Sequence, residues 1–495
     1  MRALTLRGMA VYDLVLRGGR AVDPESGLDG VRDVGIDGRQ IASISSDPLD
    51  GTTVVEVGGM VVAPGFIDLH SHAQTLAGRR LHACDGVTTV LDLEAGRAPV
   101  SAAYERDEQY GSPVHYGFSV SWAAARMEVL AGVPSDGGLG TILDNMADPA
   151  WQRAASATEV TAILERLTDG IGDGAIGIGL LMGYAPGVDP VEYTEVARLA
   201  STAGVPTFTH SRDLVETTPS VRIDGAEELV RAASETGAHM HYCHINSTST
   251  RHLDRVHRLV ERCRADGATV TTEAYPYGSG STAIGAVFLS PERLADRGID
   301  TTSVTYLPTG ERVRDATRLL ELRATDPGGL VVFDFMDDDD PGDHAILRRA
   351  LQFDGAIVAS DGMPPVWKDP VVDPLTWPLP PAVVTHPRTA GCFSRALRLW
   401  REEGAALADA LRRCTLLPAR VLEGCVPAMR DKGRLQVGAD ADVVVFDYER
   451  ISDQASYQES TRPSTGIIHV LVDGTFVVRD EHLVLDALPG RGLRA

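Results

Sequence analysis

The sequence has very little lysine and an excess of acidic residues. Only two lysines occur, Lys368 and Lys432, so arginine supplies nearly all of the positive charge. Aspartate and glutamate together number 69 against 46 basic residues, which gives a formal net charge of -23. An acidic surface of this kind disfavours contact with nucleic-acid phosphates and with anionic membranes. We therefore expect neither a nucleic-acid partner nor a membrane partner.

Cysteine is also scarce, and long apolar runs are missing. The six cysteines form no CxxC pair and show no spacing typical of a disulfide framework or a zinc knuckle. No segment approaches the roughly 18 apolar residues of a membrane span. The first residues, MRALTLRGMAVYDLVLRGG, lack the apolar stretch and cleavage site of a signal peptide. These absences predict a reduced, cytoplasmic setting and leave open a homo-oligomer.

Both ends of the chain carry short β-type runs separated by Gly, Asp and Pro. Residues 1–62 include VYDLVLRGG and TTVVEVGG, and residues 426–495 include GADADVVVFDYE and GIIHVLVDGTFVV. Alternating apolar residues bounded by turn formers predict strands. We expect the two ends to build one small β-sandwich together.

The middle of the chain, residues 63–425, has a different pattern. Short apolar strands alternate with helical segments such as DGAEELVRAASETG, which favours parallel βαβ units and a (β/α)8 TIM-like barrel. A stretch near 285–330 interrupts this rhythm and is interpreted as an insertion. A doubly wound sheet is the alternative, but no GxGxxG follows the first strand, so its dinucleotide-binding version has no support.

Potential metal ligands follow the predicted barrel strands. In such barrels the catalytic groups lie at the C-terminal ends of the strands. The strand ends carry His70 and His72 in FIDLHSH, Glu94 in TTVLDLEAG, His210 in VPTFTHSR, His244 in HMHYCHIN and Asp361 in AIVASDG. Nitrogen and oxygen ligands of these types suit zinc and its neighbours in the transition series. The sequence therefore predicts a site for one or two such ions.

These motifs resemble those of the amidohydrolase superfamily. The resemblance lies in GFIDLHSH, in the histidine after each of two middle strands and in SDG after the last strand. The further motifs GLLMGYAPG, THSR, EAYPY, THPRTAGCFSRAL and RPSTGIIHVLVDG look like the D-aminoacylase branch, the N-acyl-D-amino-acid deacylases. The resemblance implies that His70 and His72 hold one metal, that His210 and His244 hold the other, and that Asp361 is the catalytic acid and base.

The chain departs from the family pattern at two positions. Where the family has a metal-binding cysteine after the second strand, this chain has Glu94. A carboxylate has two oxygens and can span two metals about 3.5–4 Å apart. Where the family commonly has a lysine two residues after the second metal histidine, here His244, this chain has Asn246, which removes a charge suited to an acidic side chain. Neither Lys368 nor Lys432 is placed to serve as the carboxylated lysine found elsewhere in the superfamily.

The function implied by the resemblance is hydrolysis of the amide bond of small N-acyl-D-amino acids. A water activated by zinc or another divalent transition metal would attack the amide carbon, with Asp361 moving the proton. Arg388 is the candidate for binding the substrate α-carboxylate, and Arg212, Tyr275 and Tyr277 are further candidates for substrate contacts. The alternatives are hydrolysis of cyclic amides, as in hydantoinases and dihydroorotases, and a non-catalytic scaffold with the same fold.

Overall fold

The fold was obtained as a computed structural model, which describes residues 11–337, 339–367 and 375–495. Its centre is a parallel sheet of eight strands in the order β17-β12-β11-β10-β9-β8-β7-β6. These strands are β6 (Phe66–Asp68), β7 (Val87–Arg97), β8 (His115–Ser121), β9 (Ile178–Leu181), β10 (Thr207–His210), β11 (Met240–Tyr242), β12 (Val270–Ala274) and β17 (Ala356–Val358). The predicted (β/α)8 barrel is confirmed.

The barrel closes where the chain leaves β6 and β17. The backbone N–H of Asp361 donates to the carbonyl of His70 at 2.7 Å, and the N–H of His72 donates to the carbonyl of Gly362 at 2.7 Å. The carboxylate of Asp68 accepts the backbone N–H of Ser360 at 3.0 Å. Closure therefore brings the His70 and His72 segment directly against the segment that carries Asp361.

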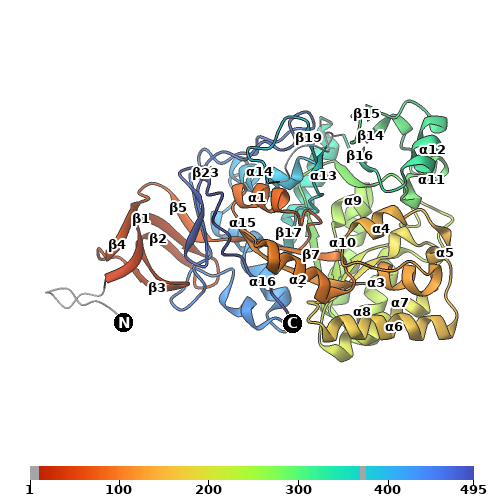
Figure 1. Ribbon diagram of the computed structural model, residues 1–495, viewed down its shortest axis with the longest axis horizontal. Helices are drawn as coiled ribbons and strands as arrows, with labels where there is room; N and C mark the ends of the chain where they lie inside the picture. The colour runs from red at the N-terminus through yellow and green to blue at the C-terminus, as the bar shows by residue number, and fades with distance from the viewer. Residues whose placement is uncertain (1–10, 338, 368–374) are drawn as a thin grey trace.

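Helices follow the barrel strands and cover the outside of the barrel (Figure 1). They are α1 (Leu76–Cys84), α2 (Val100–Tyr110), α3 (Trp122–Arg126), α4 (Gly140–Asp144), α5 (Pro149–Gln152), α6 (Ala157–Gly172), α7 (Pro190–Ala203), α8 (Gly225–Thr236), α9 (Ile245–Ser249), α10 (Leu253–Ala265), α13 (Pro341–Gln352), α14 (Arg388–Glu402), α15 (Leu407–Cys414) and α16 (Leu416–Leu422). The chain also forms a short π-helix, η1 (Met127–Ala131), and short 3-10 helices: η2 (Met182–Tyr184), η3 (Thr250–His252), η4 (Val287–Leu289), η5 (Thr301–Ser303) and η6 (Pro427–Asp431).

Local sequence explains where these helices begin and end, as α7 illustrates. The Asp189 carboxylate accepts the N–H of Val191 and so caps the first turn, and Pro190 follows in the first helical position. Gly204 ends the helix with φ of 70°, a left-handed conformation that glycine adopts at no steric cost. The connection to β10 is then short, which returns the chain to the barrel.

A second sheet joins the two ends of the chain, as predicted. Nine strands belong to it: β1 (Val11–Asp23), β2 (Leu28–Asp37), β3 (Gln40–Ser45), β4 (Asp50–Glu56), β5 (Val61–Pro64), β20 (Val443–Phe446), β21 (Ile467–Val472), β22 (Thr475–Arg479) and β23 (His482–Leu483). The two ends meet where β5 pairs antiparallel with β20. This sheet lies beside the barrel, at the left of Figure 1.

A third sheet lies between β12 and α13, where the sequence analysis expects an insertion near 285–330. Its strands, in the order β13-β16-β14-β15, are β13 (Ser279–Ala283), β14 (Val304–Tyr306), β15 (Glu311–Arg312) and β16 (Leu330–Asp334), with helices α11 (Pro291–Asp296) and α12 (Ala316–Thr325). Figure 1 shows α11, α12 and β14–β16 at the end of the molecule away from the terminal sheet. A two-stranded ribbon of β18 (Val366–Trp367) and β19 (Val383–Val384) follows β17.

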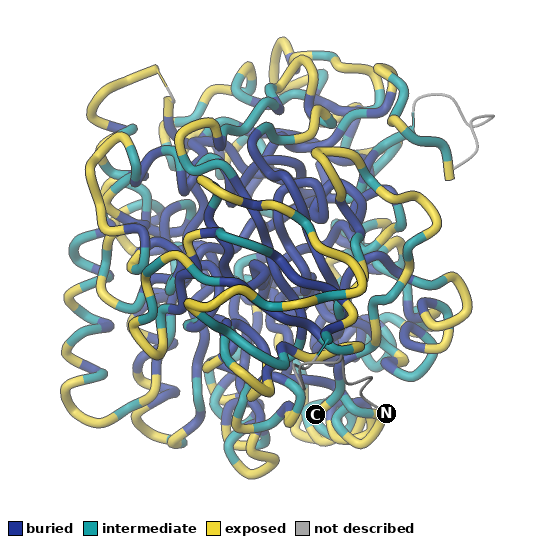
Figure 2. Tube along the Cα trace, turned by 90° about the vertical axis from the view of Figure 1, so that its left-hand side faces the viewer, coloured by how far each residue is buried: buried dark blue, intermediate teal, exposed yellow. Residues whose placement is uncertain are grey.

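Buried chain fills the middle of the molecule, and exposed loops surround it (Figure 2). All residues of β7 and β8 are buried, which fits strands covered on both faces in a barrel. Within the described ranges, no helix is both long and apolar enough to cross a bilayer.

Candidate metal centre

Glu94 stands between two pairs of histidines. Its Oε2 atom lies 3.3 Å from Nε2 of His70 and 3.5 Å from Nε2 of His72. Its Oε1 atom lies 3.1 Å from Nδ1 of His210 and 2.7 Å from Nε2 of His244. Each carboxylate oxygen therefore faces one of the two histidine pairs that the sequence analysis assigns to separate metals.

Two carboxylates fix the orientation of the first histidine pair. Nδ1 of His70 lies 2.5 Å from Oε1 of Glu273 on β12, and Nδ1 of His72 lies 3.0 Å from Oδ1 of Asp92 on β7. Because an ionised carboxylate only accepts hydrogen bonds, the ring proton belongs on Nδ1 in both residues. The lone pair of each Nε2 then points toward Glu94, as a metal ligand requires.

The second pair is held by close packing and by an unusual backbone conformation. A Cβ atom at Gly183 would lie 2.6 Å from Cδ2 of His210, so only glycine lets the η2 turn approach this ring. His244 has a φ of 34°, which side chains of L residues rarely adopt. Its Nδ1 atom lies 3.1 Å from the hydroxyl of Ser247, which leaves Nε2 directed at Glu94.

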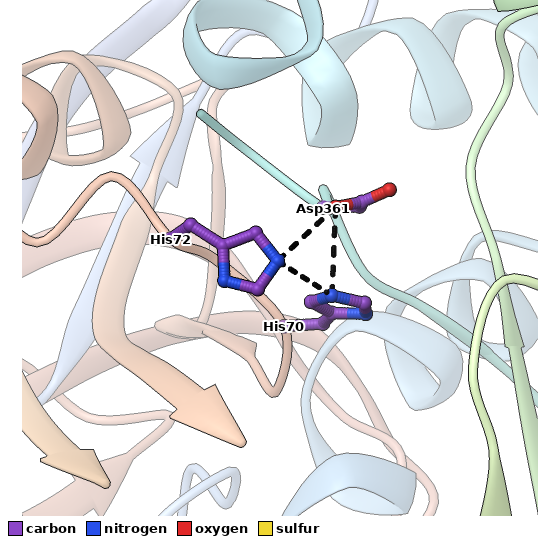
Figure 3. Close-up of side chains that lie close together, drawn as sticks. All are labelled: His70, His72 and Asp361. Carbon is purple, nitrogen blue, oxygen red and sulfur yellow. Dashed lines mark hydrogen bonds and ion pairs between the residues drawn. The ribbon is translucent and has the colours of Figure 1, made fainter. Parts of the chain in front are cut away.

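Asp361 lies beside the first histidine pair. Its Oδ1 atom is 3.4 Å from Nε2 of His70 and 3.6 Å from Nε2 of His72, and Figure 3 shows the three side chains directed toward one another. Its other oxygen, Oδ2, lies 2.7 Å from Nη2 of Arg388, whose Nε donates to the Asp361 carbonyl at 2.7 Å. The φ of Asp361 is 49°, a strained conformation that costs about 1–3 kcal/mol and is typical of functional positions.

The electrostatics of the cluster favour a bound cation. Burial raises the pKa of the Glu94 carboxyl, but the imidazoles of His70, His244 and His210 outweigh this effect and hold the pKa well below its usual range. Burial lowers the pKa of His72, but Asp92 outweighs it and raises the pKa to about 9. In the same way Glu94, Glu273 and Asp361 overcome burial and raise the pKa of His70. The carboxylates thus create a potential that draws positive charge to this buried position.

The donor set fits divalent transition metals. The described residues contain a group formed by His70, His72 and Asp361 and another formed by His70, Glu94 and His244, each with ligand atoms within 4.8 Å of one another. Imidazole nitrogens and carboxylate oxygens bind zinc at about 2.0–2.2 Å, so ligand atoms around one ion stand a few ångström apart. The buried side chains present therefore fit a divalent metal ion, and His70 belongs to both groups.

A cavity of about 560 Å³, which includes its opening to solvent, lies over this cluster. Its lining includes Glu94, His210, His244, Asp361 and the predicted substrate residue Tyr275. Arg388 is fully buried next to this lining, with its guanidinium 4.5 Å from the centre of the Tyr275 ring.

Arg388, Arg212 and Tyr277 all lie outside the lining of this cavity, but Arg388 adjoins the lining residues Asp361 and Tyr275. The Nε of Arg212 donates to Glu228 at 2.7 Å, and its Nη2 donates to the carbonyl of Val188 at 2.8 Å, so the guanidinium holds the loop after β9. Tyr277 is buried against the guanidinium of Arg395, 4.3 Å from the ring centre. Both side chains are therefore placed where they support the fold, and we do not include them in the proposed substrate site.

Lys432 and Cys84 also lie away from the metal-ligand cluster. Lys432 is buried in an ion-pair network, 2.8 Å from Asp440 and 2.6 Å from Asp442, and Lys368 lies outside the described residues. Cys84 ends helix α1, where burial raises the pKa of its thiol to about 12. No described lysine or thiol thus takes the place that Glu94 occupies between the histidine pairs.

The sequence analysis missed the two carboxylates that orient His70 and His72. Asp92 precedes Glu94 by two residues, and Glu273 stands in the quoted motif EAYPY. Both lie on barrel strands near the predicted ligands, and metal-binding histidines commonly donate their second ring N–H to a carboxylate. That rule, applied to the acidic residues of the strand ends, would have found them.

The fold and the site together define a (β/α)8-barrel protein with a candidate metal centre at its strand ends. A sequence model of the amidohydrolase family matches residues 53–478, and the chain belongs to that family. The resemblance predicted from the motifs is thus confirmed.

Three proteins resemble this chain over nearly its whole length. N-acyl-D-glutamate deacylase of Alcaligenes xylosoxydans xylosoxydans is 31% identical, over 94% of this chain and 93% of that protein. D-aminoacylase of the same organism is 28% identical, over 95% of each chain. The fold is also similar to the crystal structure of N-acyl-D-glutamate deacylase from Bordetella bronchiseptica complexed with zinc and a phosphonate inhibitor. That structure has a TM-score of 0.76 at 24% identity and covers 98% of this chain and 100% of the other.

Proposed function

We propose that the protein is a zinc-dependent deacylase that hydrolyses N-acyl-D-amino acids. The observation that carries this proposal is the position of Glu94, with one oxygen toward each histidine pair and Asp361 beside the first pair. The full-length similarity to N-acyl-D-glutamate deacylase and D-aminoacylase supports the choice of substrate. Zinc is favoured because imidazole and carboxylate ligands suit it.

The ligands proposed for the metals are His70 and His72 for one ion and His210 and His244 for the other. Glu94 would bridge the two, and Asp361 would complete the first set. A bound divalent ion polarises the amide carbonyl and makes water more acidic, so that a nucleophile is available near neutral pH. The four histidines, each held through its second ring nitrogen or by close packing, supply a rigid frame for that chemistry.

Asp361 is proposed as the general base and then the general acid. Its Oδ1 atom would take a proton from the attacking water and deliver it to the amide nitrogen as the C–N bond breaks. The ion pair of Oδ2 with Arg388 fixes the direction of the carboxylate. The left-handed φ of 49° places this carboxylate toward the metal ligands instead of along the strand.

Arg388 is proposed to bind the substrate α-carboxylate. Its Nη1 atom is buried and has no hydrogen bond of good geometry among the described residues, so a donor remains for a carboxylate ligand. A buried guanidinium binds carboxylates strongly because its N–H groups form a rigid fork. Tyr275, which lines the cavity under this guanidinium, is proposed as the second contact.

The test is a hydrolysis screen with the purified protein. N-acetyl and N-formyl derivatives of D- and L-amino acids would be offered beside hydantoin and dihydroorotate, and released amine or opened ring would be measured. We expect hydrolysis of the linear D derivatives, with the Asp361→Asn variant as the inactive control. Turnover of the cyclic amides alone would contradict the proposal, as would a preference for L derivatives. The cytoplasmic setting and the homo-oligomer stay predictions of the sequence.

A further inference from the structure

Apolar side chains make up much of the cavity wall. Leu139, Leu143 and Met146 line it from α4 and the residues beside it, and Phe288 and Phe333 line it from the inserted segment. These residues belong to two segments outside the barrel strands, namely residues 139–146 and the segment between β12 and α13. The cavity thus has a metal centre at its base and a largely apolar surface around the rest of the ligand.

The polar groups of the lining offer little to a second negative charge. The Tyr184 and Thr282 hydroxyls lie 2.9 Å apart and share a hydrogen bond, so only one of their two O–H donors remains for a ligand. Ser281 donates its hydroxyl to the carbonyl of Val331 at 2.7 Å. The charged carboxylates at the base, Glu94 and Asp361, would repel an acidic side chain.

No arginine or lysine lines the cavity in the part of the chain that the structure describes. Asn246, which stands where the family commonly has a lysine, is fully buried and turned to the backbone. Its amide donates to the carbonyl of Tyr275 at 3.1 Å and accepts the N–H of Tyr275 at 3.3 Å. Arg297 contacts the ring of Phe288, but it is paired with Asp213 at 2.6 Å.

Arg388 is the cation that adjoins the cavity, and under the proposed function it already binds the substrate α-carboxylate. A substrate with an acidic side chain brings two carboxylates, and the second would lose its water in an apolar cavity without gaining a partner. A neutral apolar side chain carries no such cost and gains contact with Leu143, Met146 and Phe333. Charge and packing therefore both favour a substrate with a neutral apolar side chain.

We propose that this protein selects N-acyl-D-amino acids with a neutral, apolar side chain and discriminates against those with an acidic one. It would differ in this respect from the N-acyl-D-glutamate deacylase to which it is 31% identical. The inference rests on the proposed deacylase function and adds the side-chain class to it. The specificity-determining features are the apolar wall from Leu139 to Met146 and the engaged amide of Asn246.

Three substrates of similar length test the inference. N-acetyl-D-methionine, N-acetyl-D-glutamine and N-acetyl-D-glutamate share the acyl group and the α-carbon and differ in side-chain polarity and charge. We expect kcat/KM to fall in that order, with methionine favoured over glutamate by about 100-fold or more, because a buried polar mismatch discriminates strongly. A preference for glutamate would overturn the inference while supporting the deacylase function. Turnover of none of the three would overturn both.

A matched pair of variants tests whether the wall sets the preference. Leu143 is partly exposed at the cavity, so a longer side chain can be accommodated there. Leu143→Lys adds a cation to the wall, and Leu143→Gln adds polarity without charge. We expect Leu143→Lys to raise the ratio of glutamate to methionine turnover at least about tenfold over Leu143→Gln. An equal ratio in the two variants would show that this wall does not face the side chain.

Discussion

The ring of His70 is fixed by Glu273, whose Oε1 atom lies 2.5 Å from Nδ1 of the histidine. The other oxygen of Glu273 lies 2.9 Å from Nε2 of His241, so the carboxylate is itself held on both sides. Burial raises the pKa of Glu273, but His70 and His241 outweigh it and lower the pKa, so the group is ionised at neutral pH. The orientation of one proposed metal ligand thus depends on a residue of β12, a strand that does not pair with β6.

Replacing Glu273 should therefore weaken the metal centre. Glu273→Gln keeps the size of the side chain but lowers its capacity to accept the Nδ1 proton, and the loss should be about 10–100-fold in metal affinity or activity. Metal content by mass spectrometry and kcat/KM would be measured together. The exposed Glu227→Gln on α8 is the matched control, since it makes the same chemical change away from the site. Equal metal affinity in the two variants would remove Glu273 from this role.

Glu94→Gln tests the proposed bridge. An amide is neutral and presents one acceptor oxygen instead of two, so both histidine pairs lose the carboxylate charge and one of them also loses its oxygen partner. We expect a lower metal-to-protein ratio and reduced turnover, with the fold retained as judged by circular dichroism. An unchanged metal ratio and unchanged activity would mean that Glu94 is not a ligand.

Asp361→Asn tests proton transfer. The four histidines and Glu94 remain in this variant, so most of the metal should be retained, while turnover should fall by about 10²–10⁴-fold. The measurement is kcat at saturating substrate beside metal content. Near-normal kcat would assign the acid and base role to another group.

Metal removal tests the centre as a whole. Dialysis against a chelator should abolish hydrolysis, and added zinc should restore it, because the proposed polarisation of the substrate carbonyl depends on a bound divalent ion. Restoration would be followed by titrating the metal against activity, which also counts the ions required. Full activity in protein shown to be free of metal would refute the proposal.

Lys432 should matter for stability and not for metal. Its ammonium is buried between Asp440 and Asp442, and removing one member of a buried ion pair costs about 3–5 kcal/mol. Lys432→Met should therefore lower the free energy of unfolding by that amount in a denaturant titration at pH 7, with metal content unchanged. An unfolding free energy equal to that of the wild type would show that the pair does not contribute.

The same network predicts a direction for the pH dependence. Burial raises the pKa of Asp442, but Lys432 and His115 outweigh it and lower the pKa below its ordinary value. A lowered carboxyl pKa stabilises the fold above the unfolded value of about 4, and this contribution is lost as the pH falls below it. The loss of stability between about pH 4 and pH 2 should be smaller in Lys432→Met than in the wild type.

The sequence determined the features that depend on local pattern. Alternation of strands and helices predicted the barrel, and the strand-end rule picked out His70, His72, Glu94, His210, His244 and Asp361, which the fold brings into one cluster. These residues come together because parallel strands of one barrel end at the same rim, whatever the details of packing. The sequence also predicted that the β-rich N- and C-terminal segments form one structure together, because both show the same pattern of short strands.

Only the tertiary structure decided what the side chains at that rim contact. Arg212 follows His210 by two residues, yet it turns to Glu228 and to loop carbonyls, because a buried guanidinium must find acceptors for all its N–H groups. Glu273 and Asp92 became orienting groups through distances between strands that no local pattern contains. The apolar wall likewise arises from α4 and the inserted sheet, two excursions far apart in the chain that packing brings over the same cavity.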